Sequence, residues 1–87
     1  MGQLATNGAF NLTQPMDTVF VKEVRPYGPA YYAGLQTGDR LLAVSGMPVA
    51  GTPYARVVAA IQQTPSTLTL QVVPKEYDIL QTVNFEN

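Results

Sequence analysis

Few side chains in this sequence could take part in chemistry. Histidine and cysteine are absent, so the usual general base and the usual thiolate are both missing. Ser45 and Ser66, the only serines, therefore have no histidine to activate them. The carboxylates are Asp17, Glu23, Asp39, Glu76, Asp78 and Glu86. Only Glu76 and Asp78 lie close together, and their polar surroundings indicate solvated surface charges. The sequence predicts no enzyme, no bound metal and no cofactor.

Composition narrows the remaining classes of function. The 87 residues suffice for one small domain, and 46% apolar residues are enough for a folded core. The net charge is −1 and the five basic residues are scattered, which disfavours nucleic-acid binding. No apolar run approaches the length of a membrane span, and the first ten residues lack the features of a signal peptide. We therefore expect a cytoplasmic domain that does not insert into membranes.

The central part of the chain predicts an α+β domain with a mainly antiparallel sheet. Residues 28–35 favour one helical turn, and residues 52–64 favour an amphipathic helix with Thr52 as its N-cap. Pro48 predicts a sheet edge, because proline cannot donate to a ladder. Strands are expected at Thr18–Val24, Arg40–Val44, Met47–Val49 and Thr67–Val73.

The two ends of the chain leave alternatives open. Residues 1–17 contain either a short strand around Phe10–Thr13 or a plain loop. The tail, residues 75–87, is either mobile or forms a further strand. Such a strand would align Ile79, Gln81, Val83 and Phe85 on one face. The expected organisation is an N-terminal segment 1–17, a core 18–74 and a C-terminal extension 75–87.

One run carries a specific family resemblance. GPAYYAGLQTGDRLLAVSGMPVAG, residues 28–51, followed by TPYARVVAAIQQT and TLTLQVV, resembles the PDZ domain, a peptide-binding module. Ser45 stands where that family usually has asparagine. The resemblance implies a small, partly open antiparallel β-sandwich or barrel with one long and one short helix. The flanks PMDTVFVKEV and PKEYDILQ resemble PDZ domains of animal Rho GTPase-activating proteins. This implies an intracellular scaffold or Rho-regulatory protein, at the cell cortex or at junctions.

The resemblance also implies a site. In this family the C-terminus of a protein partner adds as a strand to a sheet edge beside the long helix, and backbone N–H groups hold its carboxylate. Tyr54 matches the position that contacts the antepenultimate peptide residue, and Val58 and Ile61 match the pocket for the last one. Val57 is expected in the core. The stretch that stands in for the carboxylate loop and the groove strand is Ala9, Phe10, Asn11 and Leu12.

Two other arrangements compete with a complete groove. Residues 1–17 could be the end of a long insertion, so that the first two strands of the fold would be missing. The tail could instead fold back and supply a replacement strand. In either case the chain could be a truncated or rearranged unit that self-associates through its strand edge or tail and binds no peptide.

Overall fold

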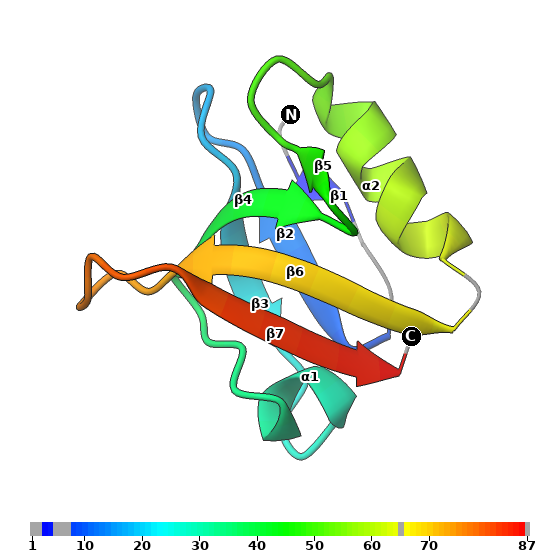
Figure 1. Ribbon diagram of the computed structural model, residues 1–87, viewed down its shortest axis with the longest axis vertical. Helices are drawn as coiled ribbons and strands as arrows, with labels where there is room; N and C mark the ends of the chain where they lie inside the picture. The colour runs from blue at the N-terminus through cyan, green and yellow to red at the C-terminus, as the bar shows by residue number, and fades with distance from the viewer. Residues whose placement is uncertain (1–2, 5–7, 65, 87) are drawn as a thin grey trace.

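The computed structural model describes residues 3–4, 8–64 and 66–86, with side chains for all of these except residues 3–4. Strands alternate with two helices, one short and one long (Figure 1). The elements in chain order are β1 (Gln3–Leu4), β2 (Phe10–Thr13), β3 (Phe20–Val24), α1 (Pro29–Tyr32), β4 (Arg40–Val44), β5 (Met47–Pro48), α2 (Tyr54–Gln63), β6 (Thr67–Val73) and β7 (Gln81–Glu86).

The strands form one sheet in the order β1-β2-β3-β4-β6-β7, and β5 pairs with β4 off this path. Every pairing is antiparallel. This confirms the predicted α+β fold and the predicted edge position of Pro48. The longest ladder joins β6 and β7 from Thr67↔Glu86 to Val72↔Gln81, and the two strands run side by side in Figure 1.

The tail therefore adopts the alternative in which it folds back as a strand. Val83 and Phe85 are buried, whereas Ile79 and Gln81, which were expected on the same face, are exposed, and Ile79 lies before the strand begins. At the other end, residues 10–13 form a strand and not a plain loop, because Leu12 and its neighbours pair along β3.

Helix α2 begins later than the sequence predicted. Pro53 is the N-cap residue and Tyr54 the first helical residue. Thr52 is not the cap: its hydroxyl donates to the carbonyl oxygen of Pro48 at 2.8 Å, which ties the helix entry to β5 instead. The prediction of Thr52 as N-cap was therefore wrong. The helix ends at Gln63, and Thr64 is extended, as the residue before Pro65 is expected to be.

The core joins β2, early in the chain, to β7, late in the chain. Phe10 and Leu12 of β2 and Val83 and Phe85 of β7 belong to one apolar cluster with the central strands and α2. The rings of Phe10 and Phe85 meet edge to face, with centroids 5.7 Å apart and planes 86° apart. The predicted domain boundaries after residues 17 and 74 stay a prediction, and the core extends across both of them.

Candidate functional site

The helical wall of the candidate site comes from α2. Its apolar residues recur at helical spacing, so one face turns toward the sheet. Val57 is fully buried in the core, as predicted. Ile61 is fully buried as well, and Val58 is 4% exposed. Tyr54 is half-buried against the core at the start of the helix, and its hydroxyl oxygen is buried.

The strand wall comes from β2. Side chains alternate along a strand, so Phe10 and Leu12 share one face and Asn11 points to the other. Phe10 and Leu12 are 2% and 0% exposed, and Ala9 just before them is also buried. The side-chain amide of Asn11 donates to a carboxylate oxygen of Glu23 on β3 at 3.4 Å. Asn11 therefore lies away from the buried face that β2 shares with α2.

The structure brings most of the predicted residues together. Ala9, Phe10, Leu12 and Ile61 lie in one apolar cluster, with Tyr54 packed against it. Val58 is buried outside that cluster, and Asn11 lies on the opposite face of β2. Strand β2 and helix α2 thus share one apolar interior.

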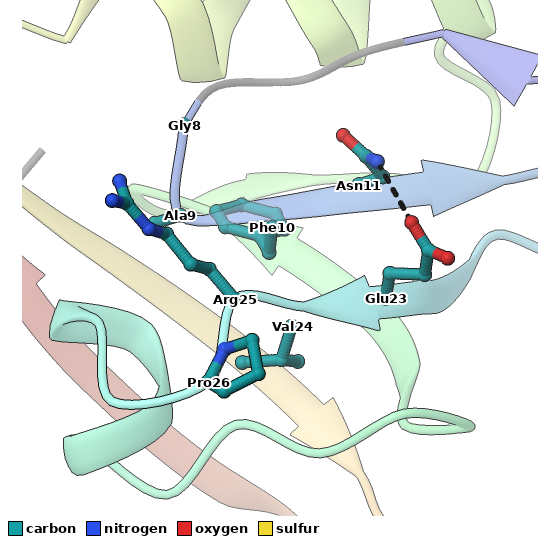
Figure 2. A pocket seen from close by; sticks show the side chains of 8 residues that line it. All are labelled: Gly8, Ala9, Phe10, Asn11, Glu23, Val24, Arg25 and Pro26. Atoms are coloured by element: carbon teal, nitrogen blue, oxygen red, sulfur yellow. Dashed lines mark hydrogen bonds between the residues drawn. The ribbon is translucent and has the colours of Figure 1, made fainter.

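A hollow of about 400 Å³ lies where β2 begins and β3 ends (Figure 2). The Gly8–Asn11 stretch lines one side of it and residues 23–26 line the other. The backbone N–H of Arg25 donates to the carbonyl oxygen of Ala9 at 2.8 Å, which holds the two segments together. In Figure 2 the Arg25 side chain extends past Ala9 toward Gly8. Tyr54, Val58 and Ile61 do not line this hollow.

The sequence alone did not identify Gly8 and Arg25 as neighbours of the site. Arg25 is the first residue after β3, and antiparallel pairing of β2 with β3 places it opposite the start of β2. That signal depends on knowing that residues 10–13 pair with residues 20–24. The guanidinium of Arg25 gives this corner a positive charge next to the stretch that was expected to hold a carboxylate.

Asp39 is the one buried charged residue among the described residues, with 2% exposure. It accepts a hydrogen bond from the backbone N–H of Gln36 at 3.0 Å, which closes the turn before β4. Burial raises the pKa of this carboxyl above its ordinary value, and the Gln36 hydrogen bond partly opposes that shift. Asp39 therefore has a structural place in the turn, away from the residues that α2 and β2 bring together.

No group of three or more histidine, cysteine, aspartate or glutamate residues is placed to hold a metal ion within residues 3–4, 8–64 and 66–86. No helix in that same part of the chain is long and apolar enough to cross a membrane.

Comparison with known proteins decides the family. The family model described as "PDZ domain" matches residues 4–73. The chain belongs to the PDZ family. This confirms the resemblance found in the sequence and makes the chain a protein-interaction module.

Similar PDZ regions occur in Rho GTPase-activating proteins. Rho GTPase-activating protein 21-B of Xenopus laevis is 55% identical over 71 residues, which cover 82% of this chain and 4% of that protein. Rho GTPase-activating protein 23 of Mus musculus is 52% identical over 68 residues, covering 78% of this chain and 5% of that protein. Na(+)/H(+) exchange regulatory cofactor NHE-RF2 of Mus musculus is 41% identical over 59 residues, covering 68% of this chain and 18% of that protein. The chain thus spans only a small part of these relatives.

Proposed function

We propose that this PDZ domain binds the free C-terminus of a protein partner by strand addition along β2, beside α2. The observation that carries the proposal is that Phe10 and Leu12 of β2 share one apolar cluster with Ile61 of α2. In this mode, backbone hydrogen bonds supply affinity and side-chain pockets supply specificity. The partner is a peptide with an apolar last residue, because the residues expected at that pocket are Val58 and Ile61.

The peptide carboxylate is assigned to the start of β2. Backbone N–H groups of the Gly8–Phe10 stretch would donate to it, as in other anion-binding turns. Arg25 adds a positive charge at the same corner of the sheet, beside the hollow in Figure 2. Tyr54 is assigned to the antepenultimate peptide side chain, because it begins α2 and is only half-buried.

The parent protein is proposed from the relatives. We infer that this chain is the PDZ region of a Rho GTPase-activating protein that acts in the cytoplasm, at the cell cortex or at junctions. The GTPase-activating activity would then belong to a part of that protein outside this chain. Self-association through a strand edge or the tail stays an alternative prediction, although the tail strand already pairs with β6 inside the chain.

Titration of a panel of C-terminal peptides tests the proposal. We expect apolar-ended peptides with a free carboxylate to bind in the micromolar range, and the matching C-terminal amides to bind at least about tenfold more weakly, because a charge-assisted hydrogen bond is lost. Tyr54→Ala should weaken binding, whereas Arg56→Ala, on the exposed side of the same helix, should leave it unchanged.

Isothermal calorimetry or fluorescence anisotropy gives the affinities. If no peptide in the panel binds more tightly than about 1 mM, and amidation has no effect, the chain does not recognise C-termini in this way.

A further inference from the structure

Strand β2 has two edges, and both are paired in the structure. One edge pairs with β3, from Phe10↔Val24 to Thr13↔Phe20. The other edge pairs with β1, which ends the sheet, through Gln3↔Thr13 and Leu4↔Leu12. A peptide added to β2 would need this second edge, because β3 holds the first one. The chain's own strand β1 therefore lies where the proposed ligand would lie.

The direction of β1 matches that of an added peptide. It pairs antiparallel with β2, and its C-terminal residue Leu4 is the one nearer the start of β2 along the register. The carboxylate of a bound peptide was assigned to that same end. The backbone of β1 thus runs in the same direction along β2 as the proposed peptide would, and it pairs with residues that the peptide would pair with.

The alternation of backbone hydrogen bonds along β2 identifies the groups for which β1 and a peptide would compete. The carbonyl oxygen of Ala9 accepts from Arg25 and so faces β3. Successive residues of a strand direct their N–H and C=O groups to opposite edges, so Phe10 and Leu12 direct theirs toward β1. Leu12 lies opposite Leu4, so this alternation directs the N–H and C=O groups of Leu12 toward Leu4. A peptide would need those same groups of Leu12.

We propose that β1 is an internal occupant of the peptide slot, so that a partner C-terminus binds this domain only after β1 has been displaced from β2. The inference rests on the proposed function and adds that β1 regulates peptide binding by competing for the same strand edge. An internal competitor lowers the apparent affinity by the fraction of molecules in which the edge is open. Because β1 has only two residues paired with β2, we expect that factor to be on the order of tenfold.

The test weakens the pairing of β1 with β2 while keeping the chain length. Gln3→Pro/Leu4→Pro deletes the Leu4 N–H that faces Leu12 and fixes the backbone at both β1 positions, and Gln3→Ala/Leu4→Ala is the matched control that keeps both N–H groups. Each protein is titrated with the tightest-binding peptide of the panel. Amide hydrogen exchange at Leu12 is measured in parallel without peptide, and thermal unfolding confirms that each variant is folded.

We expect the proline variant to bind about tenfold more tightly than both the unaltered chain and the alanine control. We also expect its Leu12 amide to exchange faster. Equal affinities in the three proteins would overturn the inference and leave the proposed function standing.

Failure of the proposed peptide binding itself gives a different result. If the opened proline variant binds no peptide, the proposed function itself is wrong, and the inference of competition goes with it. Leu12 exchange then reports on the pairing alone, since faster exchange in the proline variant than in the alanine control means that β1 protects that amide.

Discussion

Two of the described residues adopt positive φ values although neither is glycine. Tyr27 has φ +62° in the turn that the Gly28 N–H closes onto the Arg25 carbonyl, and Ser45 has φ +48°. Ser45 and Gly46 connect β4 to β5, since Val44 pairs with Met47. Positive φ at both central residues defines the tight hairpin turn that favours Asn-Gly. The asparagine that PDZ domains usually carry at this position therefore has a conformational reason.

Replacing Ser45 with asparagine should stabilise the domain. Asparagine tolerates the left-handed region better than serine, and we expect Ser45→Asn to raise the free energy of unfolding by about 0.5–1 kcal/mol. Ser45 is exposed, so few other contacts change. Urea denaturation at constant m-value measures the difference. Ser45→Ala is the control, and an asparagine variant no more stable than the alanine variant would contradict this explanation.

Among the elements, β7 has the clearest structural role. It pairs with β6 over six residue pairs, and it buries Val83 and Phe85 while exposing Thr82, Asn84 and Glu86. The apolar face of β7 covers the core, and its polar face meets solvent. The tail is therefore part of the folded domain, although the PDZ family match ends at residue 73.

Adjacent positions of β7 offer a matched test of that role. Val83→Asp places a carboxylate in the core and should lower the free energy of unfolding by at least about 3 kcal/mol. Thr82→Asp makes the same side chain on the exposed face and should change it by less than about 1 kcal/mol. Thermal or urea unfolding of both variants supplies the comparison. Similar losses at the two positions would mean that β7 is not docked as described.

The sequence predicted the candidate site only in part. Helical spacing marked the α2 residues, because a helix that packs on a sheet must bury one stripe. The β2 residues were harder to assign, since a four-residue strand has too short an alternation to distinguish it from a loop. Arg25 and Gly8 were not found, because they meet only through the pairing of β2 with β3.

At the scale of the whole molecule, strands β2 and β7, which are far apart in the sequence, meet in the core. Phe10 of β2 contacts Phe85 of β7 edge to face, although 75 residues separate them in the sequence. This contact couples the strand that carries the candidate site to β7, the strand at the far edge of the sheet. We therefore expect the domain to unfold as one cooperative unit.

A double-mutant cycle measures this coupling. Phe10→Leu and Phe85→Leu each remove one ring while keeping an apolar side chain, and the double variant removes both. The sum of the losses in free energy of unfolding of the two single variants should exceed the loss of the double variant by about 0.5–1.5 kcal/mol, the usual contribution of an aromatic pair. Urea unfolding of the four proteins gives the cycle. Strict additivity would indicate that the rings do not interact in solution.

The sequence by itself determined the family, the strands from Phe20 to Val73, the positions of the turns and the buried stripe of α2. These features depend on local side-chain pattern and on backbone conformations that few residues tolerate. Only the tertiary structure decided that β7 extends the sheet by pairing with β6 and that β1 covers the edge of β2. The physical reason is that edge pairing uses backbone N–H and C=O groups, which almost every residue has. Which segments meet at an edge is therefore set by the topology of the whole chain.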